Sequence, residues 1–305
     1  MFIGHGLLAF ALVAFLGSRL GLPARRALAF GAVAGLFATI PDIDILYGPI
    51  GLLGGVSGLG DAVDTFWATG NTVHRGPTHS LIIGALTAAG FALAGRDHWP
   101  ARLLAGGVLT AIVALTGVTS GTLDASIVAV VLIAGLGIVV AARRLAIPAR
   151  SIGVLALVGL LSHPFGDLLT GSPPDFFYPL NVVVLTERVS LHADATIHLL
   201  ASFAVELGII WCAALVYFHL TERPVRPEID PLAGLGAAYG AAVLVLPAPT
   251  VDAASPFVFS VLALGLVGVV PTRKSLRPEV YRAVLTGLTA VTLALVAYTA
   301  TYLLV

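Results

Sequence analysis

Charged residues and cysteine are both scarce in this chain. Only 10% of its 305 residues are charged and 58% are hydrophobic, whereas an ordinary soluble domain has roughly 25% charged residues. The formal net charge of zero gives no support to bulk attraction for nucleic acid. The one cysteine, Cys212, excludes an intrachain disulfide and a cysteine metal cluster. These scarcities indicate an integral membrane protein with no nucleic-acid partner.

Strand-like alternation of apolar and polar residues is absent as well, whereas long apolar runs are abundant. A bilayer core about 30 Å thick needs roughly 20 apolar residues per helix. The runs therefore predict an all-α, polytopic protein with about ten transmembrane helices. We place these spans near residues 4–20, 24–40, 79–95, 101–118, 125–142, 151–170, 197–219, 232–247, 256–270 and 281–304. Residues 1–180 would form a metal-site domain with spans 1–6, and residues 181–305 would hold spans 7–10 of the same membrane domain.

Basic residues predict the orientation of these spans. Alternate connections belong to opposite faces, and all but two of the 16 Lys and Arg residues fall on one face. Arg75 and Arg188 alone remain on the other. The positive-inside rule places the crowded face in the cytoplasm and both termini outside, in a cytoplasmic (inner) membrane. The crowded set is Arg19, Arg25, Arg26, Arg96, Arg102, Arg143, Arg144, Arg150, Arg223, Arg226, Arg273, Lys274, Arg277 and Arg282.

Histidine and aspartate gather on the opposite, outer face. Four separate segments each bring such residues to it, and this mixture of ligands binds zinc, manganese or iron. We therefore predict a site for one or two divalent ions, most simply Zn, facing away from the cytoplasm. Its candidate ligands are His5, Asp42, Asp44, His74, His79, His163 and Asp167.

The spacing within two motifs makes local predictions. In "PDID", an extended backbone after Pro41 would point Asp42 and Asp44 to the same side. In "SHPFGD", His163 and Asp167 are four residues apart and would share one helix face. Pro164 predicts a kink or a helix break at that point.

The stretch "NTVHRGPTHSLI" joins the first long outer loop to span 3. Pro77 favours the start of a helix, so Thr78 and His79 would lie in its first turn. A helix N-terminus favours a nearby anion, and the forked guanidinium of Arg75 suits a phosphate or carboxylate. In the loop before it, Asp61 to Trp67 could form a short interfacial helix.

Other polar residues have open roles. His192, Asp194 and His198 lie on the outer side, where they could be further ligands or ordinary polar residues. Glu206 falls in the middle of span 7, where an ionisable group is costly. It could reach the floor of the site or pair with a hydroxyl group.

These motifs carry a resemblance to a known family. The elements "GH" at the start, "PDID", "HRGPTHS" and "SHPFGDLLTG" resemble those of the membrane-bound metal-dependent hydrolases, also described as LexA-binding, inner-membrane-associated hydrolases. The resemblance covers roughly residues 1–180 and implies a metal-dependent hydrolase of unassigned substrate.

A more distant similarity links the chain to zinc-dependent phospholipase C enzymes. His5, Asp42 or Asp44, His79, His163 and Asp167 correspond in type and order to that family's ligands. Its later His-x-x-x-Glu pair is missing, because Ser202 stands four residues after His198 and Thr196 four after His192. The similarity thus implies one or two ions instead of three.

The favoured hypothesis is a membrane-embedded hydrolase of a phosphate ester or phosphodiester in a lipid-like substrate that reaches the outer face from the bilayer. Arg75 would stabilise the developing phosphoryl charge, and Asp44 would act as the base or as a bridging ligand. A metal-ion or proton transporter and a noncatalytic scaffold are the alternatives.

Overall fold

The computed structural model describes residues 2–270 and 280–305. The chain divides into two compact units, Met1–Arg188 and Val189–Val305. Every regular element in the described residues is a helix, so the all-α prediction is confirmed. Arg273, Lys274 and Arg277, which were assigned to the cytoplasmic face, lie outside the described residues.

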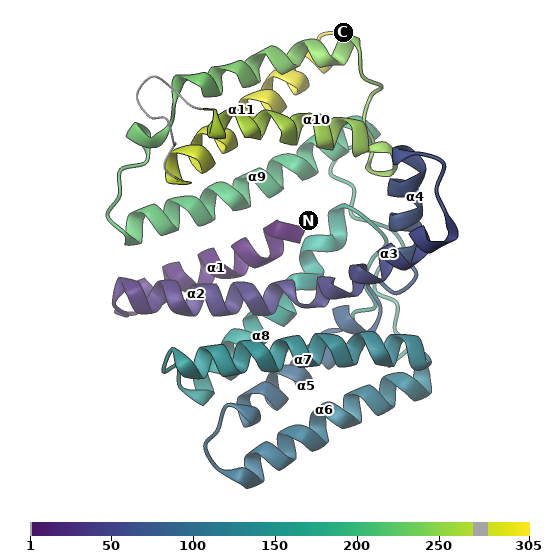
Figure 1. Ribbon diagram of the computed structural model, residues 1–305, viewed down its shortest axis with the longest axis vertical. Helices are drawn as coiled ribbons and strands as arrows, with labels where there is room; N and C mark the ends of the chain where they lie inside the picture. Colours follow the sequence, from purple (N-terminus) through teal and green to yellow (C-terminus); the bar gives the residue numbers. More distant parts are fainter. Residues whose placement is uncertain (1, 271–279) are drawn as a thin grey trace. The chain divides into compact units, whose positions relative to one another are not determined.

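The first unit is a bundle of helices (Figure 1). Its long helices pack as neighbours in the pairs α1 with α2, α2 with α8, α5 with α8, α5 with α6 and α6 with α7. The helices are α1 (Phe2–Arg19), α2 (Ala24–Thr39), α3 (Gly48–Gly51), α4 (Leu59–Gly70), α5 (Leu81–Ala94), α6 (Trp99–Thr119), α7 (Thr122–Arg144) and α8 (Ala149–Gly166). Short 3-10 helices join them: η1 (Pro41–Tyr47), η2 (Leu52–Gly54), η3 (Pro77–His79) and η4 (Asp167–Leu169).

Small residues let α1 and α2 approach closely. A Cβ atom on Gly31 would lie 2.8 Å from the carbonyl oxygen of Phe10, and one on Gly35 would lie 2.7 Å from that of Gly6. Small residues at helix interfaces allow this backbone contact in membranes. The core beyond the hairpin is apolar, with the rings of Phe37 and Phe91 stacked at 5.5 Å. This packing fixes the ends of α1, α2, α5 and α8 at the site.

Each predicted span coincides with an apolar helix, but not every one of these helices is long enough to cross a membrane. Five are long and apolar enough to cross a membrane: α6, α7, Ala149–Leu169, α9 and α11. A sixth is possible if α2 and the segment Pro41–Gly54, bent by 41°, form one broken span. Four more are shorter, at 10–17 residues. The structure therefore supports a polytopic membrane protein, while the count of about ten spans is not confirmed.

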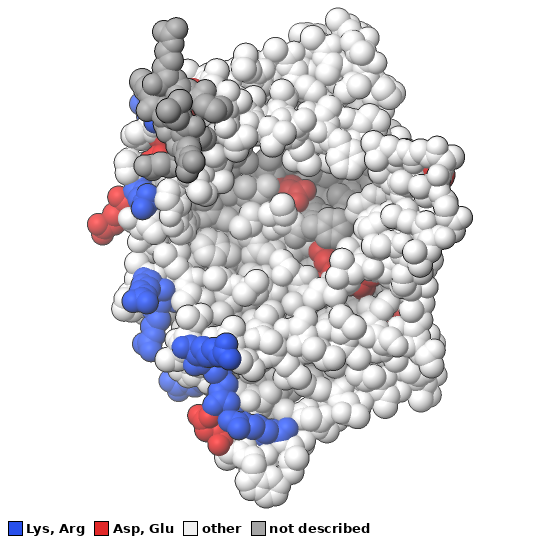
Figure 2. All heavy atoms as spheres, viewed as in Figure 1, with Lys and Arg blue, Asp and Glu red and all other residues white. Residues whose placement is uncertain are grey.

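The two ends of the first unit differ in charge. Arg19 ends α1, Arg25 and Arg26 begin α2, Arg143 and Arg144 end α7, and Arg150 begins α8. The candidate ligands lie at the opposite ends of α1, α2 and α8. On the face seen in Figure 2, Lys and Arg side chains of this unit gather on the side where α1 joins α2 in Figure 1.

A helix is present where a short interfacial helix was predicted: α4 is longer than the predicted segment, and its position at a membrane interface stays a prediction. The amide and hydroxyl groups of Ser57 donate to Asp61 at the start of α4 and hold the pKa of that carboxyl below its usual range. Phe66 and Trp67 contact each other edge to face, at 5.4 Å between ring centres.

The second unit packs its helices around an aromatic core. Its elements are α9 (Ala195–Leu220), η5 (Arg226–Glu228), η6 (Pro231–Leu244), η7 (Val251–Ala253), α10 (Ser255–Gly265), η8 (Leu266–Val269) and α11 (Val280–Tyr302). Phe257 and Tyr298 are almost fully buried at its centre, 5.0 Å apart. Gly236 of η6 and Gly268 of η8 lie against the backbone of α11, so these short helices also rely on small residues.

Candidate metal centre

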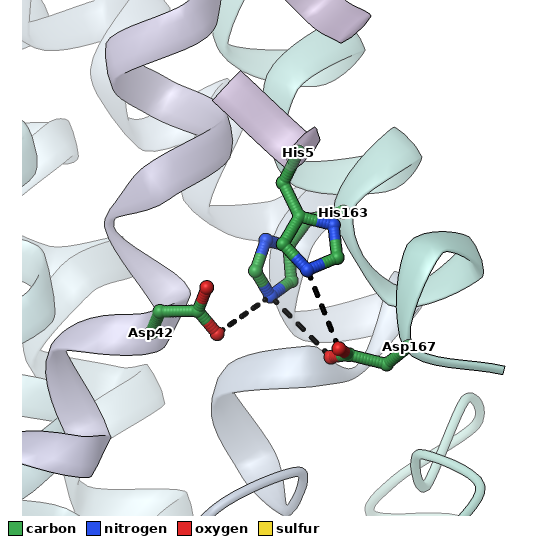
Figure 3. A group of neighbouring side chains, drawn as sticks. All are labelled: His5, Asp42, His163 and Asp167. Atoms are coloured by element: carbon green, nitrogen blue, oxygen red, sulfur yellow. Dashed lines mark ion pairs between the residues drawn. The ribbon is translucent and has the colours of Figure 1, made fainter. Parts of the chain in front are cut away.

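All seven predicted ligands converge at one end of the first unit. His5 comes from α1, Asp42 and Asp44 from η1, His74 from the loop after α4, His79 from η3, His163 from α8 and Asp167 from η4. The side chains of His5, Asp42, His163 and Asp167 point toward one another (Figure 3). His79 and His163 are fully buried, and Asp42 is 8% exposed. Residues up to 162 positions apart thus form one buried polar cluster.

The backbone of the "PDID" motif differs from the prediction. It forms the 3-10 helix η1 instead of an extended strand, and a 3-10 helix has about three residues per turn. Residues two apart therefore point in different directions. Asp42 lies against His163 and His79, whereas Asp44 lies against His74 and Thr78. The expected pairing of the two carboxylates on one side was wrong, and their separation gives them different partners.

The start of the helix after His79 also differs from the prediction. Thr78 and His79 lie in the separate turn η3, and α5 begins at Leu81. Ser80 caps α5, because its hydroxyl accepts from the amides of Ile82 and Ile83 at 3.2 and 3.3 Å. The same hydroxyl donates to the carbonyl of Tyr178 at 2.8 Å. Ser80 thus caps α5 and also bonds to the outer loop at Tyr178. His79 lies directly before this anchored residue.

Helix α8 runs through Pro164 without a break. It continues to Gly166 and then tightens into η4. Of the two expected alternatives, the break is wrong and the kink stays a prediction. Because the proline falls in the last turn, little helix follows it. His163 and Asp167 lie on one face, as predicted, with Nε2 and Oδ2 3.8 Å apart.

Four ligand atoms surround one point. They are Nε2 of His79, Nε2 of His163, Oδ1 of Asp42 and Oδ2 of Asp167. Five of their separations are 2.9, 3.2, 3.3, 3.6 and 3.8 Å. Ligands about 2.0–2.1 Å from a tetrahedral zinc ion are separated by about 3.3–3.4 Å. The cluster therefore has the size of a first coordination shell.

Hydrogen bonds fix both imidazoles with their Nε2 lone pairs turned inward. Nδ1 of His163 lies 2.6 Å from the carbonyl oxygen of Ala38, which can only accept, so Nδ1 carries the hydrogen. The hydroxyl of Thr78 donates to Asp44, and Nδ1 of His79, 2.8 Å from that hydroxyl, therefore donates to it. Such outer contacts are typical of histidines that bind metals.

When both rings are neutral, no donor within the group satisfies these inward atoms. The neutral rings present two lone pairs 2.9 Å apart, beside carboxylate oxygens that can only accept. Both oxygens of Asp42 and Oδ2 of Asp167 are buried without a hydrogen-bond partner. Buried polar atoms are nearly always satisfied. These four ligand atoms therefore fit a cation, which would accept a lone pair from each of them.

The charge balance supports the same conclusion. Asp42, Asp44 and Asp167 are buried, and among the predicted site residues only Arg75 carries a fixed positive charge. With neutral histidines the site thus has an excess of two negative charges. Burying uncompensated charge costs several kcal/mol per ion. One divalent cation would balance the excess.

His5 enlarges the ligand set. Its Nε2 lies 3.3 Å from Oδ1 of Asp167 and is otherwise unsatisfied. Two sets of four residues could hold a metal ion: His5, Asp42, His163 and Asp167 in the first, and Asp42, His74, His79 and Asp167 in the second. Asp42 and Asp167 belong to both sets. The arrangement accommodates one ion, or two ions that share these carboxylates.

Asp44 has partners for both of its oxygens. Oδ1 lies 2.7 Å from Nδ1 of His74, and Oδ2 accepts from Thr78 at 2.7 Å and lies 3.5 Å from Nδ1 of His79. These contacts place it behind His79. Its assignment as a base or a bridging ligand remains a prediction.

Arg75 is held from several sides. It donates to Oδ1 of Asp167 at 3.3 Å and to the carbonyl of Ser172 at 3.0 Å. The backbone of Gly171 lies against the guanidinium so closely that a Cβ atom there would collide with it. Arg75 itself has a positive φ of 70°, a strained conformation for such a residue. Its Nε is buried and has no hydrogen-bond partner.

The second cluster of His and Asp in the sequence has a structural role. Asp194 caps α9 and accepts from the amide of Ile197 at 2.8 Å. Nδ1 of His198 accepts from the amide of Leu191, and Nδ1 of His192 from that of Asp194. Glu206 lies within α9. Through these contacts the cluster caps and orders the start of α9.

Two contributors to the site were not predicted from the sequence as supports of the ligands. The carbonyl of Ala38 and the hydroxyl of Thr78 orient His163 and His79. Thr78 stands next to His79 in a motif that was singled out, so its position was a usable sign. The carbonyl of Ala38 had none, because a backbone oxygen has no sequence signature.

Comparisons with known proteins give one match. The model of the YdjM inner membrane protein family matches residues 1–226. Neither the curated proteins nor the solved structures include a match to the chain. The matched range contains the whole first unit with its His and Asp cluster. The chain therefore belongs to the YdjM inner membrane protein family.

Proposed function

We propose that the protein is a metal-dependent hydrolase of a phosphate ester or phosphodiester in a lipid-like substrate. The observation that carries the proposal is the set of four buried atoms, from His79, His163, Asp42 and Asp167, that face one another and that all only accept hydrogen bonds when both imidazoles are neutral. These four residues would hold one divalent ion, most simply zinc, with His5 and His74 extending the set toward a second.

A bound divalent ion supplies Lewis acidity, which polarises a phosphoryl group and acidifies water. The chain supplies the proton acceptor. Asp42 is a partner of both histidines through Oδ1, while its Oδ2 is buried without a hydrogen bond. Asp42 also lines a cavity beside the site. These contacts support Oδ2 of Asp42 as the atom that would take the proton of the attacking water.

The reaction has a simple balance. The oxygen of water forms the new bond to phosphorus, the bond from phosphorus to the ester oxygen breaks, and the proton held by Asp42 returns to the leaving alcohol. Arg75 would stabilise the negative charge of the phosphoryl group. Its Nε is the guanidinium nitrogen without a partner, while its other contacts hold Asp167 in place.

Two features support a lipid-like substrate at the extracytoplasmic face. The basic residues of the first unit lie at the helix ends opposite the cluster, and the positive-inside rule assigns such ends to the cytoplasm. The loops on the side of the cluster expose apolar side chains, such as Leu53 at 85% and Val183 at 73%. A substrate could then reach the site laterally from the outer leaflet.

The proposal is tested with purified protein, chelated and then reloaded with zinc or manganese, on a panel of phosphorylated lipids and isoprenoids. We expect metal-dependent release of phosphate or of a phosphorylated head group. His163→Ala should abolish this release. The matched control is His198→Ala, which removes a buried histidine of the second unit. Equal turnover by wild type and His163→Ala would refute the catalytic interpretation.

A further inference from the structure

A cavity opens beside Asp42. It has a volume of about 240 Å³, and its lining consists of Thr39, Asp42, Ile43 and Leu46. Asp42 is the member of the metal cluster in this lining, and it belongs to both sets of four ligands. The other lining groups are largely apolar. The cavity therefore reaches Asp42 of the cluster at one end and is otherwise bounded by apolar groups.

The apolar wall continues outward along the chain. Ile43 and Leu46 are three residues apart in η1, and side chains at this spacing lie on one face of a 3-10 helix. Ile50 follows four residues after Leu46 through α3, and Leu53 follows three residues later in η2. Helical spacing of three and four residues places successive side chains on one face. Leu46, Ile50 and Leu53 are 67%, 51% and 85% exposed.

We infer that this cavity and the stripe formed by Ile43, Leu46, Ile50 and Leu53 bind the hydrocarbon chain of an alkyl or prenyl phosphate, whose phosphate group lies at Asp42 and the metal cluster. The inference rests on the proposed function and adds the place and the shape of the apolar part of the substrate. A single linear chain suits a narrow stripe one side chain wide, and the anionic phosphate suits the cations that the cluster would hold.

The cavity would hold only the start of the chain. It has a volume of about 240 Å³ and is lined by four residues, so further carbons would run along Leu46, Ile50 and Leu53. Each carbon that lies against these side chains removes apolar surface from water. Affinity should therefore rise with chain length.

Binding of linear alkylphosphonates tests this inference, because their carbon to phosphorus bond is not hydrolysed. The zinc-loaded protein in lipid nanodiscs is titrated calorimetrically with methyl-, butyl-, octyl- and decylphosphonate. We expect the affinity of the wild type to rise with chain length, by up to about fourfold per buried methylene. Leu46→Gln should weaken the binding of octylphosphonate at least threefold. The binding of methylphosphonate and the zinc content should stay unchanged. Leu46 is exposed, so this change should not disturb folding.

Leu59→Gln is the matched control. Leu59 is 84% exposed and lies at the start of α4, outside the cavity lining. Partition of the longer phosphonates into the bilayer affects both variants equally. Affinity that does not depend on chain length would overturn the inference and leave the proposed function standing. Equal chain-length dependence in wild type, Leu46→Gln and Leu59→Gln would also overturn it. Failure of every phosphonate, including methylphosphonate, to bind would overturn both proposals.

Discussion

The two units of the molecule use the same polar residue types in opposite ways. In the second unit, His198 and Asp194 each accept a hydrogen bond from a backbone amide, and together they form the start of α9. In the first unit, His79, His163 and Asp42 turn unsatisfied acceptor atoms toward one another. A cluster of His and Asp in a sequence is therefore ambiguous. The supply of donors decides whether it is a helix cap or a cation site.

The apolar framework differs less between the units. Both rely on small residues that let helices touch, with Gly31 and Gly35 in the first and Gly236 in the second. Both bury aromatic rings, such as Phe37 with Phe91 and Phe257 with Tyr298. The contrast between the units thus lies in their polar residues.

Replacing one aspartate in each unit by asparagine should give the largest contrast. Asp167→Asn removes a charge next to His5, His79 and Arg75. We expect loss of bound metal and a fall in turnover of about 1,000-fold or more, since Lewis acidity is lost with the ion. Asp194→Asn should leave turnover unchanged, because asparagine is as good a helix N-cap as aspartate. Metal analysis gives the metal content of each variant, and initial rates give its turnover. Similar losses in Asp167→Asn and Asp194→Asn would contradict the different roles of the two units.

Loss of a supporting hydroxyl should have a smaller effect. Thr78→Val breaks the hydrogen bonds to Asp44 and His79, and loss of such an outer partner lowers metal affinity by about 10- to 100-fold. Thr286→Val is the control, since Thr286 is a buried threonine of the second unit that accepts from the amide of Asp230. Competition with a fluorescent chelator measures the affinity. An unchanged zinc affinity in Thr78→Val would show that the tautomer of His79 does not depend on Thr78.

Adding a methyl group at Gly171 should disturb Arg75 without removing a metal ligand. It therefore tests the role of Arg75 separately from metal binding. The added Cβ would collide with the guanidinium, so we expect Gly171→Ala to lower turnover by about tenfold, or roughly 1.4 kcal/mol in activation free energy, while zinc remains bound. Gly208 of α9 has open space around its Cα, and Gly208→Ala should leave turnover unchanged. Full activity of Gly171→Ala would argue against a role of Arg75 in the reaction.

The helix cap at Ser80 should give the smallest effect. Ser80→Ala removes the acceptor for two amides of α5, and loss of such a cap costs about 1 kcal/mol. The free energy of unfolding should fall by this amount in thermal or denaturant titrations of the detergent-solubilised protein. Asp194→Ala removes the cap of α9 and should cost a similar amount. Ser80→Ala should also weaken metal binding, which Asp194→Ala should not.

The sequence was sufficient for the helices and for the identity of the converging residues. Apolar runs place helices by composition alone, and the alternation of basic connections places His5, Asp42 and His163 at one end. Local geometry was less predictable. The "PDID" motif forms a 3-10 helix, because the chain after Pro41 stays helical, bent by 41° from α2, instead of extending. This conformation depends on packing with α7 and η3.

The break expected at Pro164 did not occur. The proline removes the amide that would bond to the carbonyl of Leu160, yet α8 continues through it and ends two residues later. The hydrogen bond between His163 and the carbonyl of Ala38 could not be predicted from the sequence. It depends on the contact between α2 and α8, which is a tertiary property.

Metal analysis of the purified protein tests the central claim most directly. After purification without chelators, mass spectrometry of the digested protein should find one or two divalent ions per chain in the wild type and in His198→Ala. The double variant His79→Ala/His163→Ala, which removes the two facing Nε2 atoms, should contain none while its helical circular dichroism is retained. A folded wild type that binds no divalent ion after dialysis against zinc or manganese would contradict the account.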